Sequence, residues 1–208
     1  MRASDEKREQ IVNQFLLDNF FKRYDSAATL VNDVGRQTKG VDAIFHKLNV
    51  DIKAQTNYIN NPTDTYCLEI STLNRNGEPI NGWFLNPEVI TDYYTFAWVT
   101  DADVNDKGNL LKVNKAEVIF IKKENLRRFI KLYASDEVLL NTAEQMRSTG
   151  TQRKALSGCA GVHYTMSDQL IEQPVVLVIP KSVLHSLSVK HCIVGVGSLQ
   201  DVGKNVTN

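Results

Sequence analysis

The residues best suited to chemistry lie in a short segment where polar and apolar side chains alternate. Asp51, Lys53 and Gln55 alternate there with apolar residues. Because successive side chains of a β-strand point to opposite faces, the three polar groups share one face and their apolar neighbours face a core. A carboxylate and a lysine on one face of a strand can work together in hydrolysis.

A second carboxylate precedes this strand. Asp42 belongs to another alternating segment, residues 41–45, so the two segments are typical of an antiparallel hairpin. If the connection holds an even number of residues, for instance Lys47 and Leu48 alone, Asp42 lies opposite Lys53 and on the face of Asp51. An odd connection would send Asp42 to the core side, where burying an unpartnered carboxylate costs several kcal/mol. We therefore expect the even register.

Two carboxylates and a lysine that converge on one sheet face suit the hydrolysis of a phosphodiester. Mg²⁺ is commonly held by one or two carboxylates and several waters, which leaves positions for a substrate phosphate. The ion neutralises the phosphate and lowers the pKa of a bound water, while a lysine orients that water or stabilises the developing charge. Gln55 is expected to be a further positioning group.

The elements that must position these residues follow from hydrophobic periodicity. Apolar residues three and four apart, with acids in the first turn and Gly35 just beyond, predict a long amphipathic helix over residues 5–33. The further expected elements are strands at 65–72, 92–99, 116–121, 175–179 and 187–194, helices at 124–133 and 136–147, and loops at 101–109 and 148–161. We expect an α/β protein with a core at residues 1–135 and a C-terminal α/β elaboration at 136–208 packed on the same domain.

Asp42, followed by Asp51-Ile52-Lys53 and Gln55, resembles the PD-(D/E)xK nuclease superfamily over roughly residues 5–134. The resemblance implies the restriction-endonuclease-like αβββαβ core, a mixed central sheet flanked by helices. It implies Asp42 and Asp51 as metal ligands, Lys53 as the catalytic lysine, and an acid from the first helix, for which Glu9 is the candidate. The sequence departs from the pattern at Val41, where the motif has proline. It departs again at residues 83–90, which contain Pro87 where a helix is expected.

The charge balance limits how nucleic acid would be bound. Lys plus Arg and Asp plus Glu both number 24, so no whole-chain field attracts DNA, and only a local patch would contact phosphates. The candidate nucleic-acid-binding residues are Arg36, Lys39, Lys122, Lys123 and Arg127. The first two lie in a polar segment bracketed by Gly35 and Gly40, and the others belong to a basic cluster with Arg128 and Lys131. A plain connecting loop and a solvated helix face remain equal alternatives.

Other chemistry-bearing residues receive plainer interpretations. Glu69 is kept as a reserve ligand on the expected strand at 65–72, although an exposed sheet-face carboxylate is favoured. The histidines at 163, 185 and 191 lack a ligand spacing or nearby acids, so they are interpreted as ordinary surface or core residues. Residues 157–161 lack the pattern of a nucleophile turn and are interpreted as a flexible loop. The aromatic residues at 93, 94, 96 and 98 are interpreted as core packing or as a stacking platform for bases.

The sequence therefore predicts a nuclease that depends on Mg²⁺ or Mn²⁺ and hydrolyses phosphodiester bonds of DNA. The alternative is an inactive nuclease-like module that binds nucleic acid or a protein partner. A homodimer would suit cutting of both strands, and nothing in the sequence shows one. No stretch approaches the roughly 20 apolar residues that span a bilayer, and no apolar signal core opens the chain. A cytoplasmic protein is therefore expected, and the three scattered cysteines form no zinc or disulfide framework.

Overall fold

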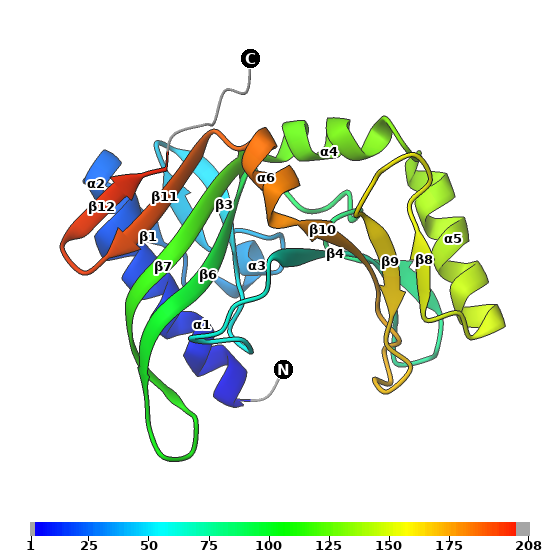
Figure 1. Ribbon diagram of the computed structural model, residues 1–208, viewed down its shortest axis with the longest axis horizontal. Helices are drawn as coiled ribbons and strands as arrows, with labels where there is room; N and C mark the ends of the chain where they lie inside the picture. The colour runs from blue at the N-terminus through cyan, green and yellow to red at the C-terminus, as the bar shows by residue number, and fades with distance from the viewer. Residues whose placement is uncertain (1–2, 203–208) are drawn as a thin grey trace. The chain divides into compact units, whose positions relative to one another are not determined.

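The computed structural model describes residues 3–202, which form two compact units (Figure 1). Within the described residues, the first unit consists of 3–63, 90–123 and 185–202, and the second consists of Asp64–Val89 and Glu124–Leu184. Each unit is therefore assembled from segments that are far apart in the chain.

The first unit contains a seven-stranded sheet in the order β1-β2-β3-β6-β7-β11-β12. The strands are β1 (Thr29–Leu30), β2 (Ala43–Phe45), β3 (Leu48–Ala54), β6 (Tyr93–Val104), β7 (Leu110–Lys122), β11 (Lys190–Gly195) and β12 (Ser198–Asp201). All pairings are antiparallel except β3 with β6, which is parallel, so the sheet is mixed. Figure 1 shows the long β6–β7 hairpin extending beyond the neighbouring strands.

A helical segment covers one face of this sheet. It consists of α1 (Ala3–Leu16), the π-helical turn η1 (Leu17–Phe21) and α2 (Lys22–Tyr24), and a short α3 (Val34–Gln37) follows after β1. Val12, Phe15, Leu16 and Phe20 pack into one core with apolar residues of β2, β3, β6, β7 and β11. Alternation therefore directs Val50 and Ile52 of β3 toward the helices.

Asp51 and Lys53 consequently lie on the opposite face of β3. The cross-strand neighbours on that face include Tyr94 and Phe96 of β6, which pair in register with Asp51 and Lys53. Both aromatic side chains have no exposed surface. The polar residues of β3 are thus surrounded by buried apolar groups, so their charges need partners.

The second unit contains a five-stranded sheet in the order β5-β4-β10-β9-β8. Its strands are β4 (Thr65–Leu73), β5 (Pro79–Asn81), β8 (Arg153–Ala155), β9 (His163–Met166) and β10 (Val175–Pro180), and every pairing is antiparallel. The helices in this part of the chain are α4 (Lys123–Lys131), α5 (Asp136–Thr149) and α6 (Lys181–Leu187). Ser135 caps α5 by accepting from the backbone N–H of Val138, and Gly150 ends it with a left-handed conformation.

The α/β class and the mixed sheet are confirmed, and several boundaries differ from the expectation. The first helix ends at Tyr24 instead of reaching residue 33, because Asp25 is extended and its carboxylate accepts from the N–H groups of Ala27 and His46. The expected strand at 65–72 forms, as β4, in the sheet of the second unit. The two strands expected at 175–179 and 187–194 are separated by the helix α6 at Lys181–Leu187 instead of by a turn at Pro180 alone.

The expected division at residue 135 does not coincide with the two units. Residues 64–89 of the expected core belong with 124–184 because β4 pairs with β10. The strands β11 and β12 of the expected elaboration instead complete the sheet of the first unit, where β11 pairs with β7. Within residues 3–202, no helix has the length and apolar character needed to cross a membrane.

Candidate active site

The tight hairpin of β2 and β3 brings two carboxylates face to face. Ala43 pairs with Val50, and the N–H of Asp42 donates to the carbonyl of Val50 at 2.9 Å, so Asp42 lies opposite Asp51. The connection consists of His46 and Lys47, both with positive φ (49° and 66°). This is the conformation of a two-residue type I′ turn. The even connection is confirmed, whereas the expected pairing of Asp42 with Lys53 is wrong because the turn lies one residue earlier.

Asp51 is a buried carboxylate with only one of its oxygens satisfied. The residue is 1% exposed. Its Oδ1 lies 2.9 Å from the Nζ of Lys53, whose side chain is 23% exposed. Its Oδ2 is buried and has no hydrogen-bond partner among residues 3–202. A buried charged oxygen without a partner is costly, so a shared proton or a bound cation would stabilise this position.

Asp42 is held beside Asp51 in an environment that resists its ionisation. Its Oδ2 accepts from the backbone N–H of Ile52 at 2.8 Å. The pKa of Asp42 is raised to about 7, mainly by burial and then by the negative charge of Asp51 and a side-chain hydrogen bond with it, while the Ile52 N–H and the charge of Lys53 act against the rise. Two adjacent carboxyls cannot both ionise freely unless a positive charge compensates them.

Glu9, on α1, belongs to the same electrostatic group. Its side chain is half-buried, and burial is the main cause that raises its pKa. The charge of Lys53 lowers that pKa, while the charges of Asp5, Glu6 and Asp51 raise it. The charges of Lys53 and Asp51 therefore act on Glu9, and its role as a metal ligand stays a prediction.

The donor set can be tested against the needs of a divalent cation. Among residues 3–202, no group of three or more His, Cys, Asp and Glu side chains is arranged to hold a metal ion. Mg²⁺, however, is commonly held by one or two carboxylates, with waters and substrate as its other ligands. Asp42 and Asp51 supply two carboxylates of that kind, and the unsatisfied Oδ2 of Asp51 is a hard oxygen ligand. The residues present therefore fit Mg²⁺ or Mn²⁺ in number and chemistry.

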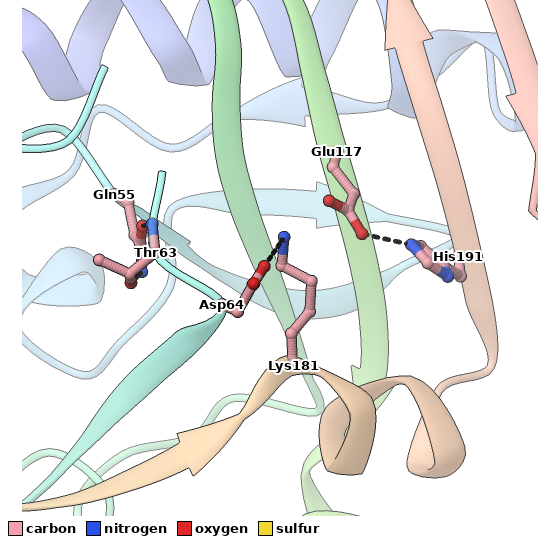
Figure 2. Close-up of polar contacts among 6 residues, drawn as sticks. All are labelled: Gln55, Thr63, Asp64, Glu117, Lys181 and His191. Carbon is pink, nitrogen blue, oxygen red and sulfur yellow. Dashed lines mark hydrogen bonds and ion pairs between the residues drawn. The ribbon is translucent and has the colours of Figure 1, made fainter. Parts of the chain in front are cut away.

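Gln55 has a structural task in the loop that follows β3. Its Nε2 donates to the hydroxyl of Thr63 at 2.8 Å, and its Oε1 accepts from the backbone N–H of Thr63 at 3.1 Å (Figure 2). Both ends of the amide are thus used to close the loop between them. These contacts do not support the expected role of Gln55 as a positioning group at the metal.

The expected nucleic-acid-binding residues are placed differently from one another. Arg36 and Lys39 are exposed in the segment just before Asp42, and Arg36 donates to the side chain of Asn49 at 3.1 Å. Arg127 is instead held within the second unit, because it donates to the Phe84 carbonyl and to Asp136 and lies over the Phe84 ring. This makes Arg127 a packing residue. Lys122 is exposed, and Lys123 is half-buried at the start of α4.

Contacts within the fold account for most of the remaining candidate residues. Tyr94, Phe96 and Trp98 have no exposed surface, and Tyr93 stacks on Phe120 at 4.7 Å, so core packing accounts for these aromatics. Glu69 lies on β4 in the second unit, where it accepts from the Trp83 N–H. The loop at residues 157–161 lines a cavity of about 560 Å³ together with Arg153 and His163.

One polar pair was missed by the sequence reasoning. The Nε2 of His191, on β11, lies 2.7 Å from the Oε1 of Glu117, on β7, and their side chains are 8% and 16% exposed (Figure 2). For His191, the expectation that no acid lies nearby is wrong, because β7 and β11 pair and bring Glu117 to it across 74 residues of sequence separation. The sequence signal that could have pointed to this pair is the alternation of Glu117 with the apolar residues Ala116 and Val118, which places a carboxylate on one face of a strand.

Comparison of the chain with protein-family models, with curated proteins and with solved structures finds no match in any of the three.

Proposed function

We propose that this protein is a Mg²⁺- or Mn²⁺-dependent nuclease that hydrolyses phosphodiester bonds of DNA. The observation that carries the proposal is the opposition of Asp42 and Asp51 across the β2–β3 hairpin, with Lys53 bonded to Asp51 and one buried carboxylate oxygen unsatisfied. If this were an ordinary solvated sheet face, water would satisfy the carboxylates and the lysine, and they would not need to be buried against one another. Burial of the pair favours a site that receives a cation.

The order of elements in the first unit supports a restriction-endonuclease-like core. The helix α1 is followed by the antiparallel strands β1, β2 and β3 and then by β6, which is parallel to β3. This order matches the αβββ-then-β sequence of that core. It differs in the connection from β3 to β6, which runs through residues 64–89 of the second unit instead of a single helix.

The chain's own residues have distinct tasks in the proposed reaction. Asp42 and Asp51 hold the cation, which would supply charge neutralisation at the phosphate and acidify a bound water. Asp51 also fixes the Nζ of Lys53 at 2.9 Å. From that position the ammonium orients the attacking water or stabilises charge that develops on the phosphate. Glu9 adds negative potential from α1 and helps to orient water at the site.

DNA contacts would be local instead of spread over the molecule. The chain carries equal numbers of acidic and basic residues, 24 of each, so its total charge provides no attraction. Arg36 and Lys39 lie exposed in the segment that leads into Asp42 and are the basic residues best located for phosphate contacts. A few contacts of this kind predict moderate affinity that falls with salt.

The test is a cleavage assay with Mg²⁺ or Mn²⁺ on a mixture of single-stranded, double-stranded and branched DNA. Wild type is compared with Asp51→Ala and Lys53→Ala, and the controls are Asp106→Ala and Lys107→Ala at the exposed β6–β7 turn. We expect cleavage by wild type and both controls and none by the two site variants. Equal cleavage by Asp51→Ala would contradict the proposal. Binding of nucleic acid or protein without cleavage or metal binding would favour the inactive module.

A further inference from the structure

A cavity of the second unit lies at the connection between β8 and β9. Its volume is about 560 Å³, and it is lined by Arg153 and residues 155–163. Ligand pockets in proteins usually measure roughly 300–1,000 Å³, so this one has room for a small molecule. All of its lining residues belong to the second unit, whereas Asp42 and Asp51 belong to the first. The cavity is therefore not part of the candidate active site.

The strand register brings two side chains that can be cationic to this cavity. Ala155 of β8 pairs with His163 of β9, and Arg153 lies two residues before Ala155. Arg153 and His163 consequently lie on the same face of the β8–β9 pair. Lys154 lies on the other face, where its Nζ donates to the Oε1 of Gln145 on α5 at 2.8 Å. The register thus directs Arg153, and not Lys154, to the cavity.

The hydrogen-bonding capacity of these two side chains is largely unused. Arg153 is exposed, and its guanidinium has no ion pair or hydrogen bond among residues 3–202. The Nδ1 of His163 lies 3.4 Å from the carbonyl oxygen of Gly161, which leaves Nε2 for another partner. Among the described residues, those that line the cavity include no Asp or Glu. A concave site with a positive charge and no acid favours an anion.

The loop between the strands adds backbone donors. Two successive β-turns form it, since the N–H of Cys159 donates to the Leu156 carbonyl at 3.2 Å and the N–H of Val162 donates to the Cys159 carbonyl at 3.3 Å. Gly158 and Gly161 occupy the third position of these turns with φ of 75° and 78°, which glycine adopts without strain. The cavity is also lined by residues whose N–H groups have no partner within 3–202, namely residues 157, 158, 160 and 161.

We propose that this cavity binds a terminal phosphate monoester, either of a free nucleotide or of a DNA end. A phosphate monoester carries more negative charge and one more terminal oxygen than a carboxylate, so it can accept from many donors at once. Arg153 binds two of its oxygens, His163 donates from Nε2, and backbone N–H groups of residues 157–161 supply the remaining bonds. The proposal does not rest on nuclease activity. Because Arg153 is exposed, the affinity is moderate and falls with salt.

The test is calorimetric titration of the full chain in EDTA with deoxyadenosine 5′-monophosphate and with a 5′-phosphorylated oligonucleotide. The controls are deoxyadenosine and the same oligonucleotide without its phosphate. EDTA keeps divalent cations away from the carboxylate pair, so the signal does not report on the proposed nuclease site. We expect at least one phosphorylated ligand to bind about tenfold more tightly than its phosphate-free counterpart. The ligand with the larger ratio identifies the source of the phosphate.

Substitutions assign the binding to this cavity. Arg153→Gln should weaken the binding of the phosphorylated ligand by about tenfold or more, because a bidentate, charge-assisted contact is lost. His163→Gln should weaken it several-fold. The matched control is Lys154→Gln, which removes the same charge from the neighbouring residue on the other face and should leave the affinity unchanged. Urea unfolding curves verify that each variant folds.

Three results would overturn the proposal: equal affinity for phosphorylated and phosphate-free ligands, equal affinity of wild type and Arg153→Gln, or an equal loss in Lys154→Gln and Arg153→Gln. Mn²⁺ titration of Arg153→Gln examines the carboxylate pair separately and should match wild type. Failure of the phosphate site is thus distinguishable from failure of the nuclease site.

Discussion

At the scale of single residues, the Asp42–Asp51 pair sets the energetics of the candidate site. Asp51 has one oxygen bound to Lys53 and the other unsatisfied. Asp42 carries a pKa raised to about 7, mainly by burial and then by Asp51. The metal-free protein therefore tolerates this pair best when a proton is shared, and a divalent cation would replace that proton.

Removing the charge of Lys53 should destabilise the metal-free protein. Lys53→Met leaves the buried Asp51 carboxylate without its cationic partner, which costs about 3 kcal/mol. Urea denaturation in EDTA measures this loss, and Mn²⁺ should restore part of it in the variant. The double variant Lys53→Met with Asp51→Asn should be more stable than Lys53→Met alone. If Lys53→Met is as stable as wild type in EDTA, the Asp51–Lys53 ion pair does not stabilise the metal-free protein.

The raised pKa of Asp42 predicts a pH dependence with a definite sign. The folded state binds this proton more tightly than the unfolded state, so the associated stability is full below the ordinary value of 3.8 and is lost as pH rises through about 7. In EDTA, wild type should therefore lose stability across this interval. Asp42→Asn should be less sensitive to pH there. Equal pH profiles for the two proteins would show that Asp42 titrates normally.

At the scale of elements, the β2–β3 turn determines which side chains meet. Strand alternation in the sequence was enough to predict both strands and the shared face of Asp51 and Lys53. It was not enough to place the turn, because His46-Lys47 lacks the Asn-Gly or Asp-Gly pair that usually marks a type I′ turn. Similarly, apolar residues at 27, 28 and 31 continue a helical spacing, and the hydrogen bonds of Asp25 that end the helix were not predictable locally.

A one-residue insertion in this turn tests the register. Adding a glycine between His46 and Lys47 makes the connection odd, and any one-residue shift sends Asp42 to the face opposite Asp51. We expect Mn²⁺ binding to be lost. The control is Lys47→Gly, which keeps the length and relieves a positive φ of 66°, so it should stabilise the protein by about 0.5 kcal/mol. Unchanged Mn²⁺ binding in the insertion variant would argue against the opposed carboxylates as ligands.

At the scale of the whole molecule, the two units are interleaved along the chain. Local patterns predicted most strands correctly but could not predict which strands pair, because pairing such as β4 with β10 joins segments about a hundred residues apart. The same limit hid the Glu117–His191 pair, which joins β7 to β11. The resemblance led us to expect the strand at 65–72 as the third strand of one sheet, whereas this strand, β4, lies in the sheet of the second unit and the strands before β6 in the first unit are β1, β2 and β3.

This interleaving predicts that a fragment ending at residue 135 will not fold. It lacks β11, which pairs with β7 in the first unit, and it lacks β8, β9 and β10 of the second. Its near-UV circular dichroism should show no fixed aromatic environment, although Trp98 and Tyr94 are fully buried in the complete chain. Cooperative unfolding of that fragment would mean that residues 1–135 form an independent domain after all.

The central claim is that Asp42 and Asp51 hold a divalent cation, and titration with Mn²⁺ tests it most directly. Wild type, Asp51→Ala and the exposed control Asp106→Ala are titrated by calorimetry above pH about 7.5, where the raised pKa of Asp42 no longer favours its protonated form. The account predicts binding by wild type and the control and none by Asp51→Ala. Absence of binding by wild type, or equal binding by Asp51→Ala, would contradict it.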